Sequence, residues 1–253
     1  MKVLAGLGAI ALGGWFAANF WRNSYTGSTQ PVTGSPGSRS DPSMQAPATE
    51  AVSGGREKHK SLIDEVDRGN ELLTEGKVAE AVEILSQAAR SNPENEDVHY
   101  NLGLALARQG KTEEAVKEYE EALRIFPNYV EAHNNLGNVL MRSGRTAEAI
   151  PHFEQAVKIL PDYAAAHNNL GTALQKVGRT ADAFAQFQLA VKCNPDYWEA
   201  HFNVGTSWLQ QGRLEEALAE FKTVLRLRPD FEPAKSLMAK IQGQQTGGGD
   251  SKP

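Results

Sequence analysis

The sequence predicts an all-α protein built from five stacked helix hairpins. The first observation is a period of 34 residues, which the prolines show at Pro93, Pro127, Pro161, Pro195 and Pro229. The second is that three further columns keep this step: Gly69, Gly103, Gly137, Gly171 and Gly205; Ala81, Ala115, Ala149, Ala183 and Ala217; and Leu85, Tyr119, Phe153, Phe187 and Phe221. A lone hairpin cannot bury its apolar face, whereas a stack of hairpins buries a continuous core, so the repeat predicts an α-solenoid.

The unit at 128–161 predicts one hairpin. Small or apolar residues recur at helical spacing over 130–142 and again over 147–160. Gly144 separates the two segments because glycine accepts the left-handed conformation that ends a helix. We expect Thr146 to be the N-cap of the second helix and Asp162 to cap the helix that follows Pro161.

The residues that recur in this unit resemble the tetratricopeptide repeat (TPR). The resemblance rests on Leu136 with Gly137, Ala149, Phe153, Ala156 and Pro161, and it covers roughly residues 62–229. It implies a right-handed superhelix in which the first helix of each hairpin lines a concave surface.

The repeats divide residues 57–229 at about 62–95, 96–129, 130–163, 164–197 and 198–229. The first copy is degenerate, with Arg68 in the column of Leu102 and Leu136, which is typical of a terminal repeat with no outer neighbour. The segment 230–242 has one apolar face and predicts a capping helix. The glycine-rich tail at 243–253 predicts disorder.

Residues 1–23 predict a single transmembrane anchor. The stretch from Val3 to Trp21 holds no charged side chain, and as a helix it reaches roughly 29 Å, close to the thickness of the bilayer hydrocarbon. Trp15 and Trp21 suit an interfacial aromatic belt. Ala5, Ala9, Gly13 and Ala17 form a small-residue stripe through which two anchors could pair as a homodimer.

The competing interpretation of this segment is a cleaved signal peptide. We favour the anchor because Trp15 and Phe16 stand where a cleavage site near Ala17 and Ala18 needs small residues. The basic residues Lys2 and Arg22 flank the segment on opposite sides, so charge leaves open which side of the membrane carries the repeats. Residues 24–56, rich in Ser, Gly and Pro, predict a disordered linker that spans on the order of 30 Å.

Composition and motifs indicate a binding protein and exclude several other classes. The formal net charge of −5 and the pI near 5.7 argue against a nucleic-acid partner, which normally requires a basic face. We find no phosphate-binding loop, nucleophile elbow or metal-ligand motif, so we expect no enzyme activity and no cofactor. The single cysteine, Cys193, cannot form an internal disulfide, and we interpret it as a packed thiol.

One histidine column, formed by His99, His133, His167 and His201, keeps the 34-residue step. Copies of one column on neighbouring repeats lie about 8 to 10 Å or more apart, too far for one ion bound at about 2.1 Å. We therefore predict that these histidines are structural and that no metal site exists. His59 and His152 fall outside the column, and we expect them to be exposed.

The candidate binding site is a row of asparagines on the first helices: Asn101, Asn135, Asn169 and Asn203. An amide offers two donors and one acceptor, so such a row can hold the backbone of an extended peptide. It resembles the asparagine ladder of the TPR superhelix in O-linked N-acetylglucosamine transferase, although no transferase domain follows. Neighbouring candidates on the same face are Asn134, Asn138, Asn168, Thr172, Arg108, Arg142 and Lys176. The alternative is that the asparagines only bridge adjacent helices.

These features together predict a membrane-tethered scaffold for complex assembly. The repeats would bind an extended segment of a protein partner in the concave groove. The alternative is a secreted or periplasmic accessory subunit of an enzyme complex, made with a cleaved signal and binding through its convex face or its repeat ends.

Overall fold

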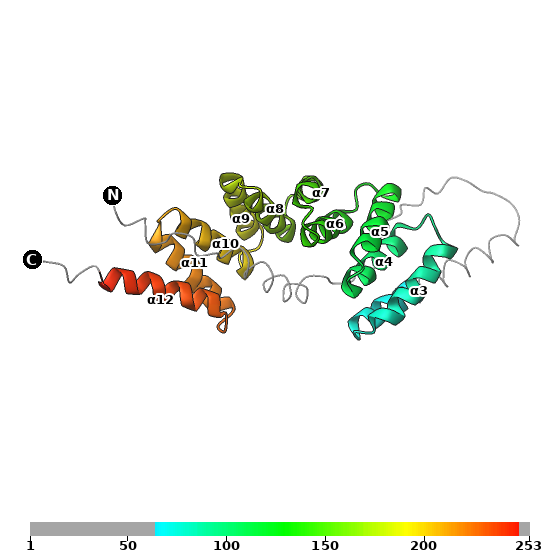
Figure 1. The fold of residues 1–253 in the computed structure, drawn as a ribbon, viewed down its shortest axis with the longest axis horizontal. Helices are drawn as coiled ribbons and strands as arrows, with labels where there is room; N and C mark the ends of the chain where they lie inside the picture. Colours follow the sequence, from blue (N-terminus) through cyan, green and yellow to red (C-terminus); the bar gives the residue numbers. More distant parts are fainter. Residues whose placement is uncertain (1–63, 248–253) are drawn as a thin grey trace, which may run out of the picture. The chain divides into compact units, whose positions relative to one another are not determined.

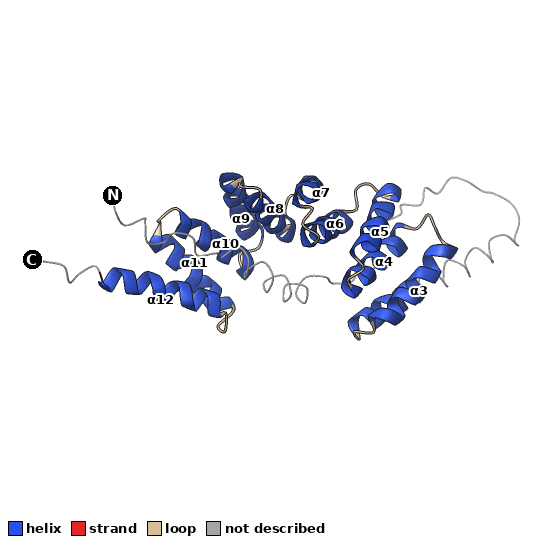
Figure 2. Cartoon of the chain, viewed as in Figure 1, coloured by secondary structure: helices blue, strands red, loops and turns tan. Residues whose placement is uncertain are grey.

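The computed structural model describes residues 64–247, all of which belong to one compact unit at 49–253. Within 64–247 the regular secondary structure is helical (Figure 2). The predicted anchor at 1–23, the linker at 24–56 and His59 lie outside the described residues. The described helices are 64–74, α3 (Val78–Ser91), α4 (Glu96–Gln109), α5 (Thr112–Ile125), α6 (Val130–Arg142), α7 (Thr146–Ile159), α8 (Ala164–Lys176), α9 (Thr180–Cys193), α10 (Trp198–Gln210), α11 (Leu214–Leu227) and α12 (Glu232–Gly247).

The helices pair into antiparallel hairpins that follow one another in chain order (Figure 1). α4 packs on α5, α6 on α7, α8 on α9 and α10 on α11, and the second helix of each hairpin packs on the first helix of the next. α12 packs on α11 and closes the series. First helices of adjacent repeats also contact each other directly, α4 with α6 and α6 with α8. The stacked-hairpin architecture predicted from the 34-residue period is therefore confirmed.

Each hairpin depends on a close approach between a glycine and a bulky side chain. A Cβ atom built on Gly137 would lie 2.6 Å from Cε1 of Phe153, a ring that is fully buried. The other glycines of this column face the equivalent side chains in the same way, Gly69 facing Leu85, Gly103 Tyr119, Gly171 Phe187 and Gly205 Phe221. The absence of a glycine side chain thus lets the two helices of a hairpin pack at this short distance.

A second glycine in each unit forms the turn of the hairpin. Gly144 has a φ of 81°, and its counterparts at 76, 110, 178 and 212 have φ between 74° and 85°. L-residues with side chains rarely adopt this left-handed conformation, which glycine adopts without steric cost. This feature agrees with the break expected from the sequence.

The expected helix caps are wrong in two places. The N-cap of α7 is Arg145, and Thr146 is already the first helical residue; the N-cap of α8 is Tyr163 in place of Asp162. Neither N-cap makes a side-chain capping bond. The turn after Gly144 is one residue shorter than the pattern suggested, and Arg145 instead pairs with Glu148 on the first turn of α7.

Two further elements differ from or add to the expectations. α12 continues to Gly247, beyond the end predicted at residue 242. α7 runs as one helix from Thr146 to Ile159 with Pro151 inside it. In the described part of the chain, every helix is too short or too polar to cross a bilayer.

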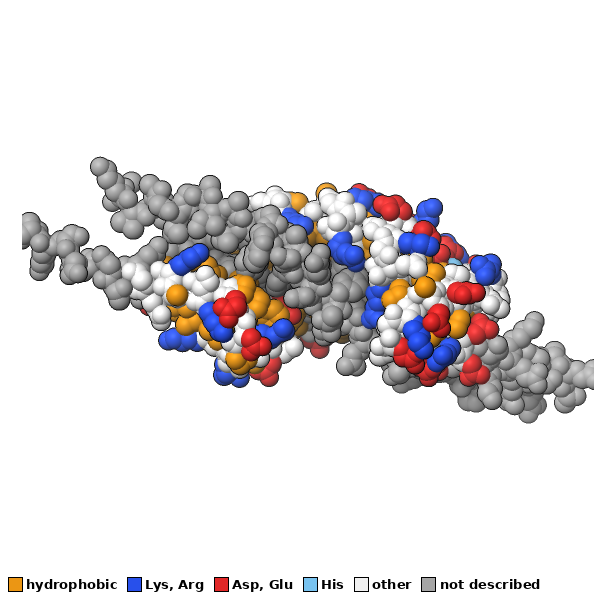
Figure 3. Space-filling model, turned by 60° about the horizontal axis from the view of Figure 1, so that its bottom comes forward, with side chains coloured by type: hydrophobic (Ala, Val, Ile, Leu, Met, Phe, Trp, Pro, Cys, Tyr) orange, Lys and Arg blue, Asp and Glu red, His pale blue; other side chains and the backbone are white. Residues whose placement is uncertain are grey.

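Acidic and basic side chains are intermixed over the face of the described residues drawn in Figure 3. Many of them form pairs one helical turn apart, such as Arg145 with Glu148 and Arg179 with Asp182. Pairs this exposed contribute about 0 to 1 kcal/mol each. The stability of the fold therefore depends on the buried columns more than on surface charge.

Candidate functional site

The structure places the predicted asparagine row on four successive first helices. Asn101 lies on α4, Asn135 on α6, Asn169 on α8 and Asn203 on α10. The side chains of Asn101 and Asn135 are buried, with 4% and 6% of their surface exposed, whereas those of Asn169 and Asn203 are half-buried. The row is thus continuous across four repeats, and it is more exposed toward its C-terminal end.

Three of these side chains form hydrogen bonds between repeats. Nδ2 of Asn169 donates to Oδ1 of Asn134 over 2.9 Å, and Nδ2 of Asn203 donates to Oδ1 of Asn168 over 2.8 Å. Nδ2 of Asn135 donates to the hydroxyl of Tyr100 over 3.1 Å. Each bond joins residues 35 positions apart, so the row bridges adjacent first helices, as the alternative hypothesis expected.

Three buried amide oxygens on the first helices have no donor among the described residues, those of Asn70, Asn101 and Asn138. Oδ1 of Asn101 and Oδ1 of Asn138 are buried and accept no hydrogen bond. The Asn101 amide nitrogen donates instead to the carbonyl oxygen of Asp97, one turn earlier, over 2.7 Å. A buried acceptor without a donor costs about 1 to 3 kcal/mol. These oxygens have almost no accessible surface, so an N–H group from outside the chain reaches them only if neighbouring side chains move aside.

The predicted basic edge has a structural role at two of its three positions. Nη1 of Arg108 donates to the carbonyl oxygen of Leu73 over 3.0 Å, and Nη1 of Arg142 lies 3.5 Å from that of Ala107. Both carbonyls belong to the last turn of the preceding first helix, where a cation is favourable to the helix dipole. Lys176 is exposed. The hydroxyl of Thr172 donates to the carbonyl oxygen of Asn168 within α8.

A tyrosine column that the sequence analysis did not consider lies next to this surface. Tyr129, Tyr163 and Tyr197 immediately precede the first helices of repeats three, four and five. The Tyr129 hydroxyl donates to Oδ1 of Asp97 over 2.8 Å, and its ring stacks on Tyr100 with the centroids 4.8 Å apart. Burial and nearby acidic groups raise the pKa of Tyr129 and raise that of Tyr163 to about 12. The 34-residue spacing of these tyrosines could have revealed the column.

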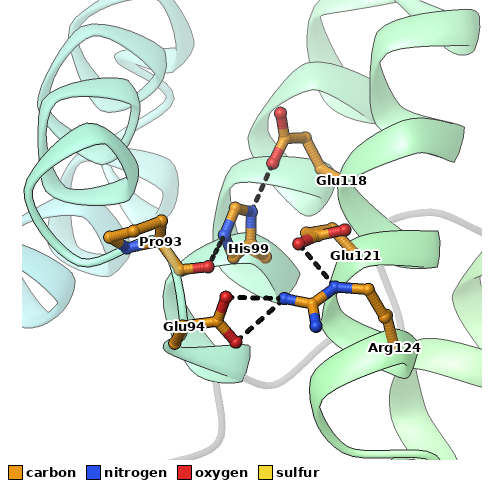
Figure 4. Close-up of polar contacts among 6 residues, drawn as sticks. All are labelled: Pro93, Glu94, His99, Glu118, Glu121 and Arg124. Carbon is orange, nitrogen blue, oxygen red and sulfur yellow. Dashed lines mark hydrogen bonds and ion pairs between the residues drawn. The ribbon is translucent and has the colours of Figure 1, made fainter.

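Each histidine of the column lies within hydrogen-bonding distance of the turn before its hairpin and of the second helix of that hairpin. Figure 4 shows His99 between two elements: its Nε2 lies 3.1 Å from the carbonyl oxygen of Pro93, and its Nδ1 lies 2.7 Å from Oε2 of Glu118. His167 and His201 repeat this arrangement with Gln186 and Glu220. Each ring therefore fastens the turn before its hairpin to the second helix of the same hairpin.

Repeat three departs from this pattern and corrects one expectation. Nδ1 of His133 lies 3.2 Å from Nδ1 of His152, so His152 is neither isolated nor fully exposed as predicted. Burial lowers the pKa of both imidazoles, and the neighbouring ring lowers that of His152 further. The sequence did not reveal this contact, because two residues 19 positions apart meet only when the two helices of the hairpin pack together.

Comparison with known proteins identifies the family. Family profiles described as tetratricopeptide repeat match residues 66–130 and 168–230, and a second such profile matches residues 128–196. The chain belongs to the tetratricopeptide-repeat family. No curated protein matches the sequence.

Several solved TPR structures have this fold. MamA 41-end from Desulfovibrio magneticus RS-1 is 25% identical with a TM-score of 0.60, covering 69% of this chain and 97% of its own. MamA AMB-1 is 27% identical with a TM-score of 0.56, covering 64% and 96%. YrrB, described as a TPR protein with an unusual peptide-binding site, is 23% identical with a TM-score of 0.58, covering 75% and 98%.

Proposed function

We propose that this TPR protein is a membrane-tethered scaffold that binds an extended segment of a protein partner along its first helices. The observation that carries the proposal is the row of asparagine side chains on α4, α6, α8 and α10. The direct contacts between first helices support an inner surface formed by these helices. The peptide-binding site named for YrrB supports a partner of the same chemical kind. We propose binding without catalysis, because the sequence carries no catalytic motif.

Among the described residues, the hydrogen-bonding capacity of the row is only partly used. Asn135, Asn169 and Asn203 each donate one hydrogen bond to the preceding repeat, while an amide nitrogen carries two hydrogens. Asn101 and Asn138 have buried oxygens without donors among the described residues. An extended backbone presents N–H and C=O groups alternately. Its C=O groups can accept the remaining amide hydrogens of the half-buried Asn169 and Asn203 irrespective of its side chains, and its N–H groups can reach the buried oxygens where neighbouring side chains move aside.

The substitution Asn138→Leu provides a sharp test of the surface. Leu104 already occupies the same column in repeat two and is buried, so leucine fits a first helix at this position. The substitution removes an amide whose oxygen has no donor in the described part of the chain, so the free energy of unfolding should not fall. We expect partners recovered by crosslinking and affinity purification of the full chain to be lost or strongly depleted with this variant.

A double variant and an outer-face control complete the experiment. Asn135→Ala with Asn169→Ala should also reduce capture, and its stability must be measured because both side chains bond to the preceding repeat. Gln155→Ala, at an exposed position on the second helix α7, should leave capture unchanged. Undiminished capture by both asparagine variants would show that the row is only a structural bridge.

The membrane tether is a separate part of the proposal, and it rests on the uncharged stretch from Val3 to Trp21. A chain held by this segment should remain in the pellet after carbonate extraction of membranes, and a chain that lacks residues 1–23 should be released. Release of the full chain by carbonate would contradict the tether. Crosslinking in the membrane tests whether two anchors pair as a homodimer.

A second candidate, an accessory subunit that binds through its outer face, is favoured by two exposed apolar residues. Phe126 and Leu160 occupy equivalent positions directly after α5 and α7, and 46% and 41% of their surfaces are exposed. Asn194 occupies the same position after α9, so the double variant Phe126→Asn with Leu160→Asn introduces a residue that this position already accommodates. Loss of partner capture by that variant, with the asparagine-row variants unaffected, would favour this alternative.

A further inference from the structure

The contact between His133 and His152 is the one place in the described repeats where the histidine column faces a second imidazole. The other histidines of the column face different side chains: His99 faces Glu118, His167 faces Gln186 and His201 faces Glu220. The two Nδ1 atoms of repeat three are 3.2 Å apart. Two nitrogens that each bind one tetrahedral ion at about 2.05 Å lie roughly 3.3 Å apart. The spacing therefore fits a shared metal ion as well as it fits an N–H···N hydrogen bond.

The tautomer of His133 is fixed in the form that binds a metal. Its Nε2 lies 3.0 Å from the carbonyl oxygen of Pro127, and because a carbonyl can only accept, Nε2 carries the hydrogen. In the neutral ring the lone pair is then on Nδ1, which faces His152. Metal-bound histidines generally donate their other ring N–H to a carbonyl or carboxylate in this way. The hydrogen bond from Nε2 to the Pro127 carbonyl would therefore orient His133 as a metal ligand.

We propose that His133 and His152 form a binding site for a divalent transition-metal ion of the Zn²⁺, Ni²⁺ or Cu²⁺ class. Imidazole nitrogen suits these ions better than Mg²⁺ or Ca²⁺, which prefer oxygen. No group of three histidine, cysteine or acidic side chains that could hold a metal occurs within the described range. The ion would therefore have two protein ligands, with water in the remaining positions.

Binding requires a proton shift on only one ring. His133 is 9% exposed, and His152 is partly accessible. In the metal-free contact Nδ1 of His152 donates to Nδ1 of His133. When the ion binds, this proton leaves to solvent and Nε2 of His152 takes one up, so both Nδ1 lone pairs face the metal and the charge of the rings is unchanged. Glu148, one turn before His152, interacts electrostatically with that ring, and its carboxylate also pairs with Arg145.

The chain offers matched variants that remove and create the site. His152→Gln reproduces the pair of His167 with Gln186 in the next repeat, so it keeps a hydrogen bond to His133 and removes one ligand. Gln186→His places a second imidazole beside His167, whose Nε2 also lies close to a proline carbonyl, at 2.9 Å. This variant should create a second site.

The experiment is a titration of the untagged full chain with Zn²⁺ at pH 7.5 in competition with a chromophoric chelator. We expect the natural chain to bind one Zn²⁺ at least tenfold more tightly than His152→Gln, and Gln186→His to bind a second Zn²⁺ with similar affinity. His59 is present in all three proteins and gives the same background. Equal Zn²⁺ affinity of the natural chain and His152→Gln, with both folded by circular dichroism, would overturn the proposal.

Discussion

The amide nitrogen of Asn169 donates to Oδ1 of Asn134 in the preceding repeat over 2.9 Å. The same relation joins Asn203 to Asn168, so two of the four row asparagines use a neighbouring asparagine as acceptor. The surface proposed to bind a partner therefore also holds adjacent repeats together. In a solenoid, stability is approximately the sum of each repeat and its contacts with its neighbours, so a substitution in the row affects folding and binding together.

We predict that Asn169→Ala lowers the free energy of unfolding by about 1 to 2 kcal/mol. The substitution removes one hydrogen bond and leaves Oδ1 of the buried Asn134 without its donor, and an unsatisfied buried acceptor contributes most of this cost. Urea unfolding followed by circular dichroism measures the effect. Asn138→Leu is the control, since it removes an amide without breaking a bond of this kind. Equal stability of Asn169→Ala and the natural chain would contradict the bridging role.

We predict that Gly137→Ala destabilises the chain by about 1 to 3 kcal/mol, the usual range for overpacking a core. The new Cβ would meet the Phe153 ring at 2.6 Å, and this ring is fully buried. Alanine is favoured over glycine in a helix by about 1 kcal/mol, so the measured loss is what remains after that gain. Thermal or urea unfolding measures the effect.

A double-mutant cycle separates this clash from other causes. In a Phe153→Ala background the space beside residue 137 is open, so Gly137→Ala should become neutral or stabilising. Gly144→Ala should stay destabilising in both backgrounds, because its cost is the φ of 81° and no atom lies near its added Cβ. An unchanged effect of Gly137→Ala in the Phe153→Ala background would show that the ring is not responsible.

The fold was predictable because its defining contacts recur at fixed offsets within one unit. Gly137 and Phe153 are close in sequence and repeat with the period, so their columns are visible in the sequence itself. The turn glycine was predictable for the same reason, since the left-handed conformation is a local property of Gly144. The repeat number, the helix pairing and the positions of the first helices followed from these columns.

The details that sequence reasoning missed depend on geometry between columns. The bond from Asn169 to Asn134 and the contact of His133 with His152 span offsets of 35 and 19 residues, which the one-column analysis could not reveal. The expected cap at Thr146 failed because a single residue, Arg145, fills the turn after Gly144. Whether the asparagine row binds a partner stays a prediction.

We predict that Trp208→Leu lowers the free energy of unfolding by about 1 to 2 kcal/mol. Leucine occupies this column at 140 and 174 and is buried there, so it fits the helix, but it loses specific contacts. Phe184 meets the Trp208 ring edge-on with centroids 4.5 Å apart, and the Arg213 guanidinium lies 4.2 Å from its centroid. An aromatic pair of this kind contributes about 0.5 to 1.5 kcal/mol, and a cation over an aromatic ring contributes about 0.5 to 1 kcal/mol. Arg213→Gln also breaks the ion pair with Glu216, so urea unfolding of Trp208→Leu, Arg213→Gln and the double variant is needed to isolate the Arg213–Trp208 contact as a double-mutant cycle.

We predict that Glu220→Gln reduces stability below about pH 6 and has little effect well above pH 7. The hydrogen bond to Glu220 raises the pKa of His201 above its ordinary value of 6.5; burial opposes this shift, and the Pro195 carbonyl adds to it. A histidine whose folded-state pKa is raised contributes stability that is fully present below its unfolded pKa and is lost as the pH rises through the folded pKa. Glutamine at 220 copies Gln186 beside His167, so the hydrogen bond remains and only the charge is lost. Urea unfolding at pH 5.5 and 8.5 measures the free energy of unfolding of the natural chain and of Glu220→Gln. The loss of stability in the variant should be larger at pH 5.5. A loss that grows with pH would show that the ion pair with His201 does not stabilise the fold.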